Sequence, residues 1–494
     1  MNVVFIMNDT WRYDHVRANG NDWISTPNLD GFAAESAVFD RSYIGSFATI
    51  PCRHDLMKGR YGEPLHYWRP LQWDCLTLPE VLRANGYVTM LINDTPHMIN
   101  YGFGFDRPFH AWQMIRGNEV DRFRTDWFRE WRLGNMDKFR TSAGMAQFYR
   151  QTHDKFLEEQ FFAPMVMDAA CTWLERNHNH DKFFLWVDSF DPHEPWDPPQ
   201  HYRDMYAPDY DGVEVVWPAY CRSSDVYTPE EQEHIGKLFA AECTMCDTHI
   251  GRVLTTIDNL GLRENTVVVI MSDHGHYFGE HDQQSKSGPL YEEVSHQILM
   301  IRHPHGIGSG ERFQALTQPA DFAPTVLEML GIEAPAEMGI QGRSLLPQMA
   351  GSNEIHRPVA VSGTFPYEIL PVGDPTYAGR RVPAPMVEPG WTPLTVTGPE
   401  YALIAYPERE RNEVYHLPSD PGMTNNIVDA NREREQELHR ELMAFLETHD
   451  SPEWIKRIYG DGPAGVQVPD IDEHLKLVRQ RGMPFTVTLD GSVL

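Results

Sequence analysis

The chain has 494 residues, of which 41% are hydrophobic and 23% charged, enough for one large core and a smaller domain. Its formal net charge of -29 argues against nucleic acid as a partner, because a phosphate backbone would be repelled. No run of about 20 apolar residues is present, so we expect no membrane partner. The absence of a secretory signal pattern and the six scattered cysteines favour a cytoplasmic location with reduced thiols.

The chain opens with a predicted buried strand, residues 2–7, whose residues are nearly all apolar. Such a run is typical of a parallel strand covered on both faces. Asn8 and Asp9 follow directly. Ligand sites in open α/β sheets lie just beyond the carboxyl ends of the strands, so Asp9 is predicted to lie at a site.

The middle of the chain holds one irregular insertion and a second predicted strand. Residues 111–162 are rich in aromatic residues and Arg without a strand period, and we interpret them as a helical lid or part of a substrate pocket, with simple packing as the alternative. Residues 181–187 are predicted to form a buried strand that leads to His193. Cys243 and Cys246 have metal or redox spacing, but they lie in a helical pattern without a second Cys pair, which favours packing.

A third predicted buried strand, residues 266–271, ends just before Asp273 and His274. Together with Asp9, the two strand ends offer three ligands. A carboxylate beside an imidazole suits a divalent ion such as Zn²⁺, Mn²⁺ or Fe²⁺. The sequence therefore predicts a metal site at the carboxyl edge of the sheet.

The pattern changes near residue 351 to Pro- and Gly-rich loops and short strands, followed by an amphipathic helix at 431–447. We predict an α/β catalytic domain at 1–350 and a smaller α+β domain with a short antiparallel sheet at 351–450. Residues 451–494 would be a C-terminal extension, either an oligomer arm or a segment packed on its own subunit.

Several short motifs follow one another in a fixed order. They are Thr49-Ile50-Pro51-Cys52-Arg53, Asp191-Pro192-His193-Glu194-Pro195, Asp273-His274-Gly275 with Lys286 downstream, and the C-terminal segment 413–422. Together they resemble the sulfatase and phosphonate monoester hydrolase branch of the alkaline phosphatase superfamily over roughly residues 1–430. The resemblance implies an α/β/α sandwich with a large, mostly parallel sheet, a hydrolase of small anionic esters, and a dimer or tetramer.

Thr49 is the main departure from sulfatases. In that family the corresponding residue is a Cys or Ser that becomes formylglycine, and Thr cannot be converted in that way, so no formylglycine is expected. An unmodified Thr instead resembles branches whose metal-bound Thr attacks phosphorus. A formylglycine hydrate can expel sulfate by reverting to the aldehyde, whereas a Thr ester must be cleared by water, as phosphoryl intermediates are. Cys52 has the wrong offset for modification and is interpreted as a packing residue.

The resemblance also implies roles for the other site residues. Thr49 would be both metal ligand and nucleophile, while Arg53 and Lys286 would stabilise charge on the non-bridging oxygens. His193 would protonate the leaving alcohol or contact the transferred group. Further candidates, on resemblance alone, are Asn8, His97, Asp191 and His281.

Two departures bear on the metal. Sulfatases usually have Asp-Asp where this chain has Asn8-Asp9, and Asp-Asn where it has Asp273-His274, and both changes favour a transition metal over Ca²⁺. We expect one divalent ion, Mn²⁺ or Zn²⁺, with Fe²⁺ and Ca²⁺ as alternatives. A second ion is less favoured and would draw on Asp191 and His281.

Three functional hypotheses follow. The leading one is a metal-dependent hydrolase of phosphodiesters or phosphonate monoesters that forms a covalent phospho-Thr49 intermediate. The alternative is a sulfuric ester hydrolase that uses unmodified Thr49. The third is a soluble phosphotransferase or a ligand-binding descendant of the fold, and the joint presence of all the motif residues argues against a pure binding module.

Overall fold

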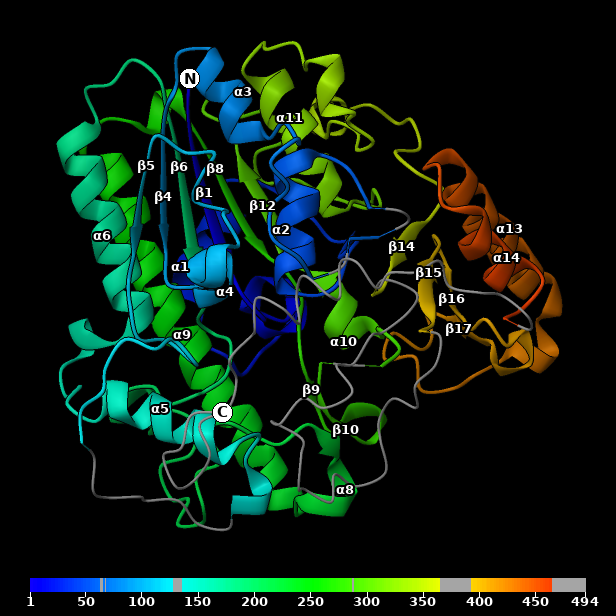
Figure 1. Cartoon of the computed structure of the whole chain (residues 1–494), viewed down its shortest axis with the longest axis horizontal. Coiled ribbons are helices and arrows are strands. Elements are labelled where there is room, and N and C mark those ends of the chain that lie inside the picture. The colour runs from blue at the N-terminus through cyan, green and yellow to red at the C-terminus, as the bar shows by residue number, and fades with distance from the viewer. Residues whose placement is uncertain (63–64, 67, 128–135, 287, 365–391, 464–494) are drawn as a thin grey trace.

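The computed structural model describes residues 1–62, 65–66, 68–127, 136–286, 288–364 and 392–463. An eight-stranded sheet in the order β13-β2-β12-β8-β1-β6-β4-β5 forms the centre of the large domain (Figure 1). Strands β8, β1, β6, β4 and β5 pair in parallel, whereas β12 is antiparallel to both β8 and β2. The strands are β1 (Asn2–Asn8), β2 (Ala37–Phe39), β4 (Val88–Asn93), β5 (Ala111–Met114), β6 (Phe183–Ser189), β8 (Thr266–Ser272), β12 (Leu299–Arg302) and β13 (Arg312–Phe313).

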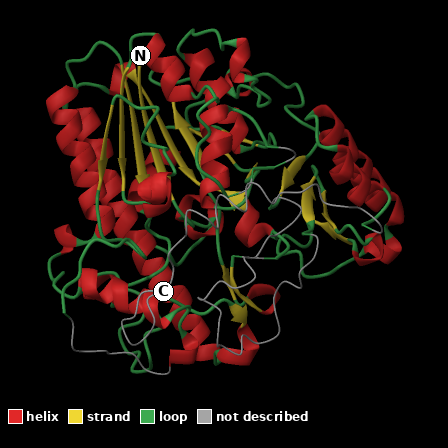
Figure 2. Ribbon diagram, in the orientation of Figure 1, coloured by secondary structure: helices red, strands yellow, loops and turns green. Residues whose placement is uncertain are grey.

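Helices cover both faces of this sheet (Figure 2). Helices α1, α6 and α9 share one core with one side of the sheet, and α2, α3 and α11 share a second core with the other side. The helices of the large domain are α1 (Pro27–Ala33), α2 (Thr49–Lys58), α3 (Leu78–Ala84), α4 (Pro96–Ile99), α5 (Ser142–Thr152), α6 (Phe162–Asn177), α7 (Gln200–Arg203), α8 (Ser223–Val226), α9 (Pro229–Asn259), α10 (Glu292–Ser295), α11 (Phe322–Met329) and α12 (Leu346–Met349). Within the described residues, none of the helices has the length and apolar character needed to cross a membrane.

Strand β1 shows why the predicted strands are continuously apolar. Val4 and Ile6 enter the core with α6 and α9, while Val3, Phe5 and Met7 enter the core on the opposite face. Successive side chains of a strand point to opposite faces, so a strand between two helical layers must be apolar at every position. The predicted α/β/α sandwich is thereby confirmed.

The parallel register brings the ends of the central strands together. Asn8, the last residue of β1, pairs with Ser189 of β6 on one side and Ser272 of β8 on the other. The residues that follow these positions therefore meet at one edge of the sheet. Asp9 and Asp273 are brought to the same place by this register alone.

A smaller antiparallel sheet lies beside the large domain (Figure 1). It has the order β14-β15-β16-β17 and packs with its helices around a separate apolar core. Its elements are β14 (Ala360–Ser362), β15 (Leu394–Thr397), β16 (Tyr401–Ala405), β17 (Glu413–His416), α13 (Arg432–Thr448) and α14 (Glu453–Gly460). The predicted small α+β sheet is confirmed, whereas residues 464–494 lie outside the described residues, so the oligomer arm and the domain boundaries stay predictions.

Two short sheets complete the fold: β7 (Cys221–Arg222), β9 (Tyr277–Phe278) and β10 (Gln283–Ser285) in one, and β3 (Ser42–Tyr43) and β11 (His296–Gln297) in the other. The insertion at 111–162 begins with edge strand β5, not with helix as expected. Three of the four β5 residues are exposed, and an edge strand facing solvent carries no alternating apolar pattern. Helix α5 supplies the helical part, and residues 128–135 lie outside the description.

Candidate active site

Asp9, Asp273 and His274 form a fully buried cluster at the ends of β1 and β8. His274 Nε2 lies 3.8 Å from Asp9 Oδ1 and 3.7 Å from Asp273 Oδ2, and it has no hydrogen-bond partner among the described residues. The Nδ1–H of His274 donates to the Gly275 carbonyl, so Nε2 carries the lone pair. Burial and the nearby Lys286 lower the pKa of His274 to about 3, which keeps the imidazole neutral and able to bind metal.

Arg53 lies against three buried carboxylates. Its Nη2 and Nε donate to Asp188 at 2.8 and 3.1 Å, and its Nη1 lies 3.1 Å from Asp9 and contacts Asp273. The single positive charge of Arg53 offsets only one of the three carboxylates that it contacts. Two negative charges therefore remain in the buried cluster. Since each uncompensated buried charge costs several kcal/mol, a divalent cation would balance the cluster.

The donor set fits such an ion. Among the described residues, Asp9, Asp273 and His274 are the only group of three whose His, Cys, Asp or Glu ligand atoms lie within 4.8 Å of one another. Two carboxylates and one imidazole suit Mn²⁺, Zn²⁺ or Fe²⁺ better than Ca²⁺. Asn8 donates its amide to the Asp191 carbonyl at 3.0 Å, and its Oδ1 is buried without a hydrogen bond, which makes this oxygen a candidate further ligand.

Thr49 is the first residue of α2 and is buried. Arg53 Nη1 donates to its carbonyl at 3.1 Å, and the ring of the nearby Phe47 lies 5.0 Å from that of His274. The N-terminus of α2, its positive end, therefore lies near the guanidinium that contacts Asp9 and Asp273, which favours negative charge there. Cys52 is fully buried and its thiol pKa is raised well above the usual value by burial, as a packing role requires.

Lys286 and His193 meet at one carboxylate. Lys286 Nζ lies 3.3 Å from the hydroxyl of Thr10, which in turn donates to Asp9, and 3.9 Å from Glu194 Oε2. His193 Nδ1 donates to the Glu194 carbonyl and lies 3.3 Å from its carboxylate. Burial lowers the pKa of His193 well below the usual value despite the attraction of Glu194. His193 is therefore neutral at pH 7, with its lone pair on Nε2.

Glu194 is a site residue that the sequence did not single out. It is fully buried, and its Oε1 accepts hydrogen bonds from Tyr220 and, at 3.1 Å, from Arg140. Burial alone would raise the pKa of Glu194, but His193 and Lys286 hold it well below its usual value. Glu194 is thus an ionised carboxylate between the two predicted catalytic side chains and the insertion that carries Arg140.

His276 is the second residue that was missed. It is fully buried, its Nδ1 donates to the Tyr277 carbonyl, and its Nε2 has no partner among the described residues. Its ring packs edge-on against Trp196 at 5.2 Å. The only signal in the sequence was its position two residues after His274.

His97 lies on the wall next to His193. Its Nε2 is 2.8 Å from Glu119, and the ring of Phe190 lies between the two histidines, 5.9 Å from His97 and 3.9 Å from His193. The expectation that His97 is close to the reaction centre stays a prediction. The contacts support a place on the rim of the site.

Asp191 and His281 are not brought to the metal cluster. The carboxylate of Asp191 accepts the backbone N–H of Ala163 at 2.8 Å. His281 stacks on Tyr291 at 3.7 Å and lies 3.4 Å from Glu293. A second ion held by Asp191 and His281 would therefore need a rearrangement of both side chains.

Comparison with known proteins agrees with this geometry. The Sulfatase family profile matches residues 1–332. The N-acetylglucosamine-6-O-sulfatase of Bacteroides thetaiotaomicron is 23% identical over 523 aligned residues, covering 90% of this chain and 85% of that protein.

Two solved structures share the fold. The phosphonate monoester hydrolase of Agrobacterium radiobacter superposes with a TM-score of 0.72 and 20% identity, covering 91% of this chain and 96% of that one. A protein solved with its substrate D-glucosamine-2-N,6-O-disulfate superposes with a TM-score of 0.68 and 19% identity, covering 92% of this chain and 98% of that one. The family match spans well over half of the chain, and the cluster at the strand ends fits the metal site typical of the superfamily. The chain belongs to the sulfatase family of the alkaline phosphatase superfamily and is a hydrolase that acts on ester bonds.

Proposed function

We propose that this protein is a metal-dependent hydrolase of sulfuric esters of small organic molecules and that it uses Thr49 without modification. The observation that carries the proposal is the buried cluster of Asp9, Asp273 and His274 within a chain of the sulfatase family. A relative named as a sugar sulfatase and a structural neighbour with a disulfated sugar as its substrate support the sulfuric ester. On this ground we rank sulfuric esters above phosphorus esters as substrates, whereas the sequence favoured phosphorus esters.

Asp9, Asp273 and His274 would hold one divalent ion, with Mn²⁺ and Zn²⁺ favoured. When bound, this ion would supply the Lewis-acid charge that lowers the pKa of a nearby hydroxyl. We assign this hydroxyl to Thr49, the first residue of α2.

In the first step, the Thr49 oxygen attacks sulfur and the bond from sulfur to the ester oxygen breaks. Neutral His193 takes the Thr49 proton on Nε2 and then gives it to the departing alkoxide. The imidazolium formed in between is stabilised by the carboxylate of Glu194, 3.3 Å away. Water then attacks sulfur, which releases sulfate and a proton and restores the Thr49 hydroxyl.

Lys286 would stabilise charge on the sulfuryl oxygens, and Glu194 would hold it in position. Arg53 has a different part in this proposal from the one expected from the sequence. All three of its guanidinium nitrogens contact protein oxygens, so Arg53 would orient the ligand carboxylates and the start of α2 without touching the substrate.

Phosphonate monoesters and phosphodiesters are the second candidate class, and Thr49 itself favours them. A Thr ester of phosphorus is cleared by direct water attack, whereas a Thr ester of sulfate lacks the aldehyde route open to formylglycine. The same residues would act in the same order on phosphorus. The fold shared with a phosphonate monoester hydrolase is compatible with this substrate.

Initial rates on matched nitrophenyl sulfate, phosphonate monoester and phosphodiester would test the proposal. We expect sulfate to be the fastest substrate for the metal-loaded protein, Thr49→Ala to lose about 10³-fold or more, and Thr49→Ser to keep part of the rate. Thr255→Ala, which removes a hydroxyl that bonds only to the Gly251 carbonyl of α9 in the described contacts, is the control. A faster phosphonate or phosphodiester would favour the second class, and appreciable turnover by Thr49→Ala would exclude the covalent route.

A further inference from the structure

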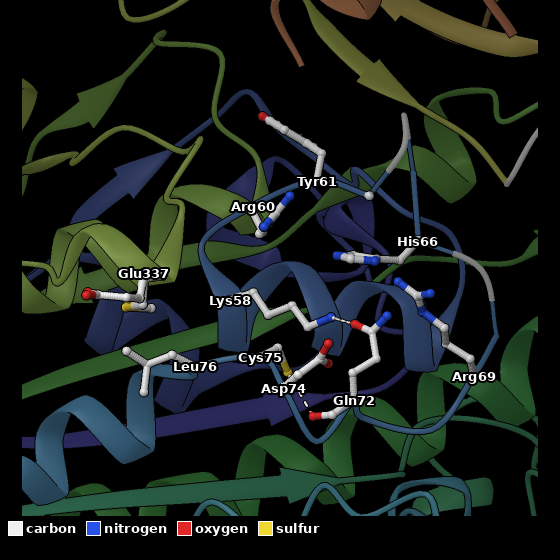
Figure 3. Close-up of a pocket in the computed structure, with 12 residues that line it drawn as sticks. Lys58, Arg60, Tyr61, His66, Arg69, Gln72, Asp74, Cys75, Leu76 and Glu337 are labelled. Atoms are coloured by element: carbon white, nitrogen blue, oxygen red, sulfur yellow. Dashed lines mark hydrogen bonds between the residues drawn. The ribbon is translucent and has the colours of Figure 1, made fainter. Parts of the chain in front are cut away.

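A separate polar cavity of about 210 Å³ lies at the carboxyl end of α2 (Figure 3). Lys58, the last residue of α2, lines it, whereas Thr49 begins the same helix. At a rise of 1.5 Å per residue the two ends of α2 are about 13 Å apart. The cavity is therefore distinct from the metal cluster, and nothing in the proposed hydrolysis uses it.

Cations gather in this cavity although the chain as a whole is strongly acidic. The lining holds three positively charged side chains, Lys58, Arg60 and Arg69. It holds two carboxylates, those of Asp74 and Glu337. Figure 3 shows the basic side chains coming from the end of α2 and from the segment that follows it. In a protein with a formal net charge of -29, an excess of positive charge in a hollow indicates attraction for an anion.

Hydrogen-bond donors in the cavity also lack partners. His66 is only 3% exposed, and neither of its ring nitrogens has a hydrogen bond among the described residues. The Nε of Arg60 is likewise buried without a partner in this part of the chain. The carboxyl oxygen Oδ1 of Asp55 lies 3.9 Å from His66 Nε2, beyond hydrogen-bond distance. Buried polar groups are normally satisfied, so unpartnered donors beside a cavity point to a ligand.

The titration of the lining agrees with a positive local potential. Burial is the main cause that lowers the pKa of Lys58, to about 8, and Arg69 and Arg60 lower it further. The pKa of His66 is held well below its usual value, first by burial, then by His54 and after it by the cations of the lining. A bound anion would relieve this repulsion and favour the protonated forms.

We propose that this cavity binds a small oxyanion, phosphate or sulfate, with Arg60 and Lys58 supplying charge and His66 supplying a hydrogen bond. The cavity exceeds the size of a free oxyanion, and Asp74 and Glu337 can accept hydrogen bonds from hydroxyl groups. The oxyanion is therefore expected to be bound best as the end group of a small hydroxylated ester.

Isothermal titration of the full-length, metal-loaded protein tests the proposal. The Thr49→Ala background prevents turnover, and the probes are inorganic sulfate, inorganic phosphate and glycerol phosphate. We expect one class of sites in addition to the active site, with glycerol phosphate bound more tightly than either free ion. Equal affinities would identify the free ion as the ligand.

Arg60→Gln should weaken binding at the additional site by about tenfold or more, since a charge-assisted hydrogen bond is lost. In the Thr49 protein, the same substitution should leave kcat within about twofold. Arg176→Gln, an exposed arginine at the end of α6, changes the net charge equally and should alter neither quantity. If Arg60→Gln binds like Arg176→Gln, or if only one class of sites exists, the proposal is overturned.

Lys58→Gln is the second variant should Arg60→Gln fail to fold. A crystal of the unaltered protein soaked in selenate gives a reading that needs no substitution. An anomalous peak between Arg60 and His66 supports the site, and a peak at the metal cluster alone contradicts it. These measurements read binding, so they keep their meaning even if the enzyme hydrolyses none of the proposed esters.

Discussion

The two walls of the proposed active site are built in different ways. The metal wall follows directly from the ends of β1 and β8, whose register fixes Asp9 beside Asp273. The opposite wall, with His193 and Lys286, consists of loops joined through Glu194 to Arg140 of the insertion. The first wall depends on the sheet, and the second depends on contacts between distant loops. Substitutions on the metal wall should therefore change metal content and stability. Substitutions on the wall with His193 and Lys286 should change proton transfer.

The largest expected effect is on the metal wall. His274→Ala removes the only imidazole of the proposed ligand cluster, so we expect most of the bound metal to be lost and turnover to fall by about 10³-fold or more. Metal content by mass spectrometry after gel filtration measures the first effect. His276→Ala, which removes an equally buried histidine two residues away, should keep its metal. Full metal occupancy in His274→Ala would refute the predicted ligand set.

Arg53→Ala should cause the second largest effect, in stability. It leaves the carboxylate of Asp188 buried without its main partner, which costs about 3–5 kcal/mol for a broken buried ion pair. The free energy of unfolding from urea titration of metal-free protein gives this value. Arg302→Ala is the matched control, because Arg302 is also buried but its ion-pair distances are 3.6 and 3.7 Å. Equal losses in both variants would mean that volume, not charge pairing, accounts for the effect.

These two predictions rest on features that the sequence reveals. Residues 3–7 and 267–271 are apolar at every position because both faces of the strands are covered, and that pattern also locates their polar ends. The motif order, in turn, suggests Thr49 and Lys286, whose roles stay predictions. Local pattern and parallel pairing therefore suffice for the fold and the metal wall.

The other wall was less predictable. Glu194 is held by hydrogen bonds from Tyr220 and Arg140, which lie 26 and 54 residues away in the sequence. Both belong to irregular segments. Strand β5 was missed because its exposed side chains leave no apolar alternation. The motif order also suggested His281, yet its ring stacks on Tyr291, away from the cluster. Loop conformations of this kind depend on tertiary contacts, for which a single sequence carries no periodic signal.

Glu194→Gln should have a moderate effect on proton transfer. The carboxylate raises the pKa of His193 against the larger, lowering effect of burial. Removal of the Glu194 charge should therefore lower the pKa of His193 further. The acid limb of the pH profile of kcat should then move to lower pH. Because the imidazolium is less stabilised, kcat at pH 7 should fall by about tenfold.

The matched control for Glu194→Gln is Glu119→Gln, which alters the carboxylate 2.8 Å from His97. This variant should leave the acid limb unchanged. If the acid limb of the pH profile does not move in Glu194→Gln, the role of Glu194 is purely structural. Stability gives an independent reading. The folded-state pKa of Glu194 is depressed, so its stabilising contribution is present above the unfolded value of about 4.3 and is lost as the pH falls through the folded value.

The smallest expected effect belongs to the link between the insertion and the site. Arg140 donates to Glu194 and Tyr220, each at 3.1 Å, and its guanidinium lies 4.1 Å from the centre of the Tyr220 ring. Arg140→Ala leaves Lys286 and His193 to hold the carboxylate, so kcat/KM should fall only about threefold. Because a nearby cation is lost, the same limb should move slightly to higher pH. Arg124→Ala, which breaks an exposed pair with Asp154 in the same insertion, should change neither. If Arg140→Ala instead abolished turnover, the insertion would be part of the reaction centre, and the difference between a wall fixed by the sheet and a wall adjusted by loops would no longer hold.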